Sequence, residues 1–230
     1  MGSRTFSGRI LGVRGVVPCF LLLAFFVPLA NAQKSACGDG DYDCLIAENT
    51  KLIQADPRDE NAYMRRADAY YNKGTNYQLA VNDYSKVIEL DPKNAQMFGY
   101  RADAYAKLKL YDLAMSDYTR SIQLDPNDPA IYIGRGNAYD DQGNPDLAIS
   151  DYSRAIQLDA TNAIAYYNRG VAYGRKKMNS AAIDDYSKAI SLNPNYAYAY
   201  KNRGILYDLN KETEKAAADR KKYDELTKKP

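Results

Sequence analysis

The residues of this 230-residue chain that could carry out chemistry are carboxylates, arginines and cysteines, because the sequence contains no histidine. Without histidine, neither a Ser-His-Asp or Cys-His catalytic group nor a histidine-ligated metal can form. Pairs of adjacent acids occur, such as Asp140-Asp141 and Asp184-Asp185. Adjacent residues of a helix point in different directions, so neither pair can flank a substrate as two catalytic carboxylates do. Since the sequence also lacks a glycine-rich phosphate-binding loop, we predict no catalytic residue, no metal site and no cofactor.

Cys37 and Cys44 enclose the acid-rich segment CGDGDYDC. A disulfide between them would close a small loop before the first predicted helix and stabilise the fold by about 2–3 kcal/mol at most. The CxxC spacing of a redox-active pair is missing. A calcium-binding loop requires Gly at its sixth place and Glu at its twelfth, where Cys44 and Thr50 stand. We therefore predict a Cys37–Cys44 disulfide that acts as a local structural link.

Residues 1–32 have the pattern of a secretory signal peptide. Arg4, Arg9 and Arg14 precede an apolar run at 16–29, and Ala-Asn-Ala at 30–32 is typical of a cleavage site. The run is shorter than the ~20 residues that span a bilayer, so we predict cleavage and no stable membrane insertion, with an uncleaved anchor as the alternative. Cleavage leaves 28 basic residues against 29 acidic ones, which gives no reason to expect nucleic-acid binding. We predict an exported protein, periplasmic in a bacterium or otherwise secreted.

One ten-residue pattern recurs every 34 residues, beginning at Asp83, Asp117, Asp151 and Asp185. Each copy predicts two helices. In the first helix an aromatic residue, a small residue and a tyrosine share one face, and in the second an alanine, a tyrosine and an isoleucine do so. Helices of about 12–15 residues are marginal alone in water, so each pair must be covered by its neighbours. The pattern predicts an all-α protein, a right-handed α-solenoid of stacked helix pairs.

The period of 34, the aromatic–Gly/Ala–Tyr pattern, the alanine that opens the second helix and the closing proline resemble the tetratricopeptide repeat, over about residues 60–230. Two departures occur: arginine replaces the usual leucine before the small residue, and Arg220 replaces the second-helix tyrosine of the fifth copy. The predicted organisation is a cleaved signal peptide at 1–32, an N-terminal lead with the cysteine pair and a half-repeat helix at 33–59, full repeats at 60–94, 95–128, 129–162 and 163–196, and a degenerate fifth repeat with a C-terminal cap at 197–230.

Two charged positions recur in every copy, one on each helix. We predict that they form a ladder of structural ion pairs that fixes the register of the two helices, because buried ion pairs add little net stability. The alternative, an anion-binding row of arginines, is less favoured because an aspartate accompanies every arginine. The predicted ladder consists of Arg66, Arg101, Arg135, Arg169 and Arg203 with Asp83, Asp117, Asp151, Asp185 and Asp219.

The resemblance implies that the first helices line a concave groove that holds an extended peptide or a partner helix. Acidic groove residues gather in the first three copies, whereas Arg175 and Lys201 lie in the last two, so we predict a polarised groove that attracts basic segments at one end and a carboxylate near Lys201. The alternative is a solvated polar face without a ligand. The predicted groove residues are Arg65, Asp68, Tyr71, Tyr100, Asp103, Asn137, Asp140, Tyr167, Asn168, Arg175, Lys201 and Asn202.

The function that follows is a non-enzymatic, exported scaffold that binds a protein or peptide partner in its groove. Two alternatives stay open at this point. One is a small-ligand-binding or enzymatic groove, and the other is a structural solenoid that self-associates end to end.

Overall fold

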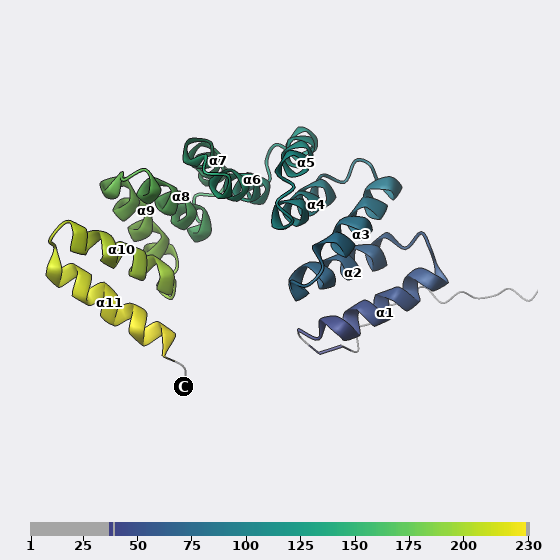
Figure 1. The fold of residues 1–230 in the computed structure, drawn as a ribbon, viewed down its shortest axis with the longest axis horizontal. Coiled ribbons are helices and arrows are strands. Elements are labelled where there is room, and N and C mark those ends of the chain that lie inside the picture. The colour runs from purple at the N-terminus through teal and green to yellow at the C-terminus, as the bar shows by residue number, and fades with distance from the viewer. Residues whose placement is uncertain (1–36, 39, 229–230) are drawn as a thin grey trace, which may run out of the picture. The chain divides into compact units, whose positions relative to one another are not determined.

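The computed structural model describes residues 37–38 and 40–228, and within these residues the chain forms eleven α-helices and no strand (Figure 1). None of these helices combines the length and the apolar character that crossing a membrane requires. The predicted signal peptide at 1–32 lies outside the described residues. The helices are α1 (Tyr42–Ala55), α2 (Glu60–Lys73), α3 (Tyr77–Leu90), α4 (Ala95–Lys107), α5 (Tyr111–Leu124), α6 (Pro129–Asp141), α7 (Pro145–Leu158), α8 (Ala163–Arg175), α9 (Asn179–Leu192), α10 (Ala197–Leu209) and α11 (Thr213–Thr227).

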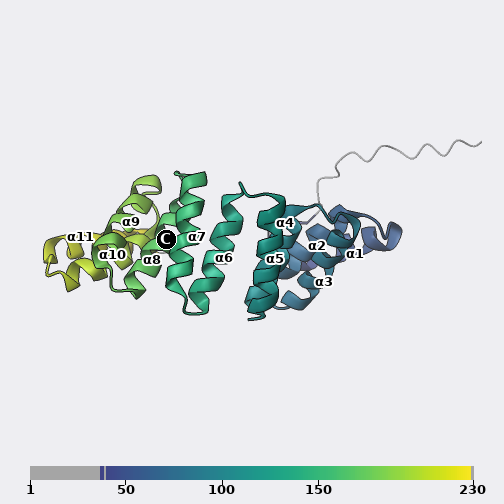
Figure 2. The same ribbon diagram turned by 90° about the horizontal axis from the view of Figure 1, so that it is seen from above.

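Each predicted copy from residue 60 onward contains two helices, which pack against each other, and α1 packs on α2. Successive pairs are stacked in chain order, as the two views in Figures 1 and 2 show. The first helix α6 also contacts the first helices α4 and α8 directly, so these three helices line one face of the stack. The predicted fold class, an α-solenoid of tandem helix pairs, is confirmed.

The junction after each of α1, α3, α5, α7 and α9 is set by an aspartate or asparagine. Each of these residues has an extended backbone, which ends the helix, and its side chain accepts a hydrogen bond from the N–H two residues further on, at 2.9–3.0 Å. This local turn competes with a further helical turn, and the proline that usually follows cannot continue the helix. The sequence therefore places the breaks at Asp56, Asp91, Asp125, Asp159 and Asn193.

The turns inside each pair need one residue in the left-handed region. Gly74 and Gly143 supply it at φ 73° and 77°, which glycine adopts without steric cost. Lys109, Lys177 and Lys211 take the same conformation in the other three repeats, at φ 58–62°. A residue with a Cβ atom is strained there by roughly 1–2 kcal/mol, so the stacking of the helices holds these lysines in place.

Tyrosines of the second helices fill the space between the two helices of a pair. Tyr118 and Tyr152 are only 1% exposed, and the rings of Tyr152 and Tyr186 face the small residue of their partner helix. A Cβ atom added to Gly136 would lie 2.7 Å from Tyr152 Cε1, and one added to Gly170 would lie 2.8 Å from Tyr186 Cε1. The small residue at this position is therefore required by the close approach of the ring.

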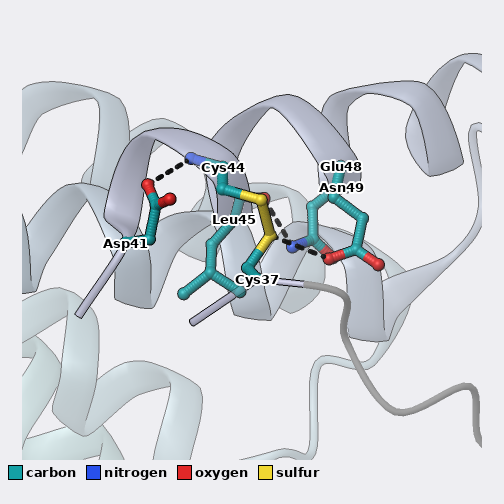
Figure 3. Close-up of a disulfide and its surroundings, with 6 residues drawn as sticks. All are labelled: Cys37, Asp41, Cys44, Leu45, Glu48 and Asn49. Carbon is teal, nitrogen blue, oxygen red and sulfur yellow. Dashed lines mark hydrogen bonds between the residues drawn. A yellow bond between two sulfur atoms is a disulfide. The ribbon is translucent and has the colours of Figure 1, made fainter. Parts of the chain in front are cut away.

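The N-terminal segment before α2 begins with the two cysteines. Their sulfur atoms lie at bonding distance, with Cα atoms 5.6 Å apart, at the start of α1 (Figure 3). Asp41 caps α1 by accepting a hydrogen bond from the Cys44 N–H at 3.0 Å. Glu48 occupies the position in α1 that the ladder aspartate takes in the full repeats, and Glu48 Oε2 lies 3.5 Å from Cys37 Sγ. Among the described residues no first helix precedes α1, and the cysteine segment contacts α1 at the position where a first helix would pack.

Candidate functional site

The ten predicted ladder residues come together pair by pair. In every repeat the arginine donates from Nε to aspartate Oδ2 at 2.7–2.8 Å and from Nη2 to Oδ1 at 2.7–2.9 Å. The aspartate side chains are buried, and aromatic rings of the first helix lie 5.6–5.9 Å from each guanidinium carbon. The hydrogen bond to the aspartate raises the pKa of each arginine, so all five stay charged.

A second bond ties most of these arginines to the preceding repeat. Nη1 of Arg66, Arg101, Arg169 and Arg203 donates to a hydroxyl on the second helix before it, at 3.0–3.1 Å. Arg135 lacks this bond, and the Thr119 hydroxyl at the equivalent place donates only to the Met115 carbonyl. The residue type is not the cause, because the hydroxyl that Arg66 uses also belongs to a threonine. The cause is spacing, since α5 and α6 are the least extensively packed consecutive helices of the described chain.

Two glycines explain this spacing. A Cβ atom on Gly99 would collide with the Ile131 side chain, and one on Gly134 would lie 2.9 Å from Asp103 Oδ1. Without these Cβ atoms α4 and α6 approach closely, and they contact each other more extensively than any other first helices of successive repeats. At this junction the first helices α4 and α6 are therefore in closer contact, while the second helix α5 packs less extensively on α6.

Buried tyrosines of the second helices donate hydrogen bonds to three of the predicted groove residues. The hydroxyls of Tyr84 and Tyr118 donate to Asp68 and Asp103 at 2.7 and 2.5 Å, and the Tyr152 hydroxyl donates to Asn137 at 2.8 Å. Burial raises the pKa of Asp68 and of Asp103, and the tyrosine bond opposes this effect only in part. These groove residues therefore also join the two helices of a repeat, a role that their position in the repeat did not reveal.

A hollow of about 230 Å³ lies over Gly134, between α2, α4 and α6. Asp103, Asn137 and the predicted groove residue Tyr71 line it, together with Lys107 and Asp141. The position of Gly134 carries a side chain in every other repeat, namely Arg65, Tyr100, Asn168 and Asn202. At this position of α6, therefore, no side chain projects into the groove. The hollow brings together three of the predicted groove residues, Tyr71, Asp103 and Asn137.

The structure changes the interpretation of the groove charges. Arg175 Nη1 lies 2.8 Å from Asp140 Oδ1 and donates to the Asp140 carbonyl oxygen at 2.9 Å, so the two residues that we placed at opposite ends of a polarised groove bind each other. Asn202 donates to the Tyr167 hydroxyl at 3.1 Å, and the Lys201 ammonium lies 5.5 Å from the centre of the Tyr223 ring. At the predicted carboxylate-binding end, Asn202 is therefore bonded within the chain, and Lys201 is exposed beside an aromatic ring.

Asn168 and Arg65 complete the predicted set. Asn168 donates to Asn137 Oδ1 at 2.9 Å, which already accepts from Tyr152, so these three side chains form a polar chain along the groove. Arg65 is exposed on α2, and Tyr100 is 38% exposed on α4, with its ring 5.9 Å from that of Tyr84.

Large apolar residues of the last two repeats also occupy groove positions of the repeat. Tyr198, Ile205 and Leu209 are 58%, 51% and 66% exposed and share one face of α10, because they are spaced by seven and four residues. Ile164, at the position equivalent to Tyr198, is 53% exposed on α8. The repeat positions of Tyr198, Ile205 and Leu209 hold the polar residues Asn61, Asp68 and Asn72 in the first copy, so the sequence shows the difference between the repeats. The groove changes from polar to apolar along the chain.

The fold and the groove define a helical-repeat scaffold with no catalytic arrangement among the described residues. Models described as "Tetratricopeptide repeat" match residues 60–94, 163–196 and 186–218, and a model described as "TPR repeat" matches 102–143 and 136–177. The chain belongs to the tetratricopeptide repeat family, whose fold generally serves as a non-enzymatic scaffold for protein–protein interaction. A comparison with curated protein sequences gave no match.

Solved structures share this fold. The crystal structure of MamA is 28% identical and matches 73% of this chain and 91% of the MamA chain, with a TM-score of 0.61. PilF of Pseudomonas aeruginosa is 20% identical over 76% of this chain and 80% of its own, with a TM-score of 0.69. YrrB, described as a TPR protein with an unusual peptide-binding site, is 21% identical over 78% of this chain and 92% of its own, with a TM-score of 0.57.

Proposed function

We propose that this protein is an exported scaffold that binds a peptide or a partner helix in the groove of its first helices, and that it is not an enzyme. The observation that supports this proposal best is the exposed apolar face of α10 with Ile164 of α8. Large apolar side chains that are exposed together on a soluble domain are typical of an interaction site. Their place in the groove, and not on the second helices, favours a partner that lies across several repeats.

Aspartate at two apolar groove positions should abolish partner binding. The double variant Ile205→Asp/Leu209→Asp places charge on a face that is already exposed, so it should fold normally and yet lower partner recovery at least tenfold. The measurement is affinity recovery from the native extracellular or periplasmic extract. Leu147→Asp on α7, which changes an apolar residue that is also half exposed, is the matched control and should recover the partner like the unaltered chain. If the double variant recovered the partner as well as Leu147→Asp does, the apolar face of α10 would be excluded as the binding face.

Export is supported by the signal pattern at 1–32 and by the position of the two cysteines, because disulfides persist in exported proteins and are rare in reducing compartments. We therefore propose that the chain is cleaved after Ala32 and that Cys37 and Cys44 are bonded in the cell.

Mass spectrometry of the protein recovered from its native compartment should give an N-terminus at Gln33 and a mass about 2 Da below that of the same chain after reduction. An intact N-terminus would contradict cleavage, and an unchanged mass after reduction would contradict the disulfide. Purified protein should also turn over none of a broad panel of substrates.

A further inference from the structure

We propose that the hollow over Gly134 is a subsite for a cationic side chain, a lysine or an arginine, of the peptide that lies in the groove. This inference rests on the proposed function and names the chemistry that one part of the groove recognises. It also replaces the charge pattern expected from the sequence: the attraction for a basic segment is concentrated in one hollow instead of being spread over three repeats.

The first argument is the state of the carboxylates in the hollow. Asp103 and Asp141 both line it, and neither forms an ion pair in the described part of the chain. By contrast, the groove residue Asp140 is already bound to Arg175. One oxygen of Asp103 accepts the Tyr118 hydroxyl, which leaves the other available. A partly buried carboxylate without a cation is stabilised when a cation binds beside it.

The walls suit the methylene groups of a long cationic side chain. Ala106, Ala130 and Ile133 present apolar atoms, and the ring of Tyr71 closes one side. Lysine and arginine bury their stems along such surfaces while the charged end reaches polar partners, and an aromatic face adds to the attraction. The hollow is several times larger than the ~30 Å³ that one water molecule occupies in the liquid, so a side chain can enter it.

The electrostatic field in the hollow is negative. Lys107 also lines the hollow and lowers the pKa of Asp103, but Lys107 is exposed and the hollow contains two carboxylates, those of Asp103 and Asp141. Burial and then the charge of Asp103 raise the pKa of Tyr71 to about 12, as expected for a tyrosine that lines the same hollow as this carboxylate. A bound cation would therefore meet a net attraction, and removal of the Lys107 charge should increase it.

The test uses small probes that carry only the proposed group. Butylammonium and butylguanidinium are titrated into the purified protein, with butanol as the neutral probe and butyrate as the anionic one, and binding is followed by the backbone amide signals of Gly134 and Ala106 in ¹⁵N NMR spectra. We expect both cations to shift these signals with millimolar dissociation constants, and the neutral and anionic probes to leave them unchanged.

Asp103→Asn should weaken cation binding about fivefold or more, because the charge is lost while the shape is kept. This variant should fold, since Asn137 accepts the equivalent tyrosine hydroxyl in the next repeat. Lys107→Met should strengthen binding about twofold, and Asp184→Asn, at an exposed site on α9, should leave it unchanged.

Equal shifts with butanol, or unchanged affinity in Asp103→Asn, would overturn the subsite. The two proposals fail separately. If the cations bind in the hollow but no partner depends on the apolar groove residues, the subsite stands and the scaffold function does not. If a groove partner is recovered but the cations do not bind, the reverse holds.

Discussion

Replacement of Arg135 by methionine is expected to lower the free energy of unfolding by about 3 kcal/mol. The aspartate partner, Asp151, is 6% exposed and would lose both charged hydrogen bonds, and a buried carboxylate without a cation is strongly unfavourable. Arg135 is the most informative of the five arginines because it lacks the bond to the preceding repeat, so the result isolates the ion pair. The measurement is urea unfolding followed by far-UV circular dichroism.

Two further variants decide whether the ladder stabilises the fold or fixes its register. Arg154→Met, at an exposed arginine of α7, should cost less than about 0.5 kcal/mol. The double variant Arg135→Met/Asp151→Leu should return to within about 1 kcal/mol of the unaltered protein, because an apolar pair can replace a buried ion pair. An Arg135→Met variant as stable as Arg154→Met would show that Asp151 is solvated and that the ladder has no structural role.

Tyr152→Ala is expected to be the most destabilising single change, by about 3–5 kcal/mol. The ring is 1% exposed and packs on Gly136, so its removal leaves a cavity between α6 and α7 that neither helix can fill. Tyr152→Phe keeps the ring and removes only the hydroxyl, which should cost about 1 kcal/mol, since Asn137 still accepts from Asn168.

The difference between these two variants separates packing from hydrogen bonding. Tyr198→Ala, at an exposed tyrosine, is the matched control and should change the midpoint of urea unfolding only slightly. If Tyr152→Phe cost as much as Tyr152→Ala, the hydrogen bond to the groove, and not the filling of the space between the helices, would hold the pair together.

The sequence by itself determined the fold, because every element is specified locally. The 34-residue period, the aspartate or asparagine that ends each second helix and the N-terminal caps such as Asp59 and Asp128 are signals within a few residues of where they act. The pairing of each arginine with one aspartate was also predictable. Both lie on facing helices of one repeat, and the same geometry recurs five times.

Only the tertiary structure decided what the groove residues do. The position of a residue in the repeat gives the face on which it lies, but not how deeply a tyrosine such as Tyr118 reaches through to that face, nor how closely the next repeat approaches. The pair between Arg175 and Asp140 and the hollow over Gly134 arise between repeats. Their distances depend on side chains from helices about 30 residues apart, because the stacking of one repeat on the next is set by the sum of many contacts and not by any local signal.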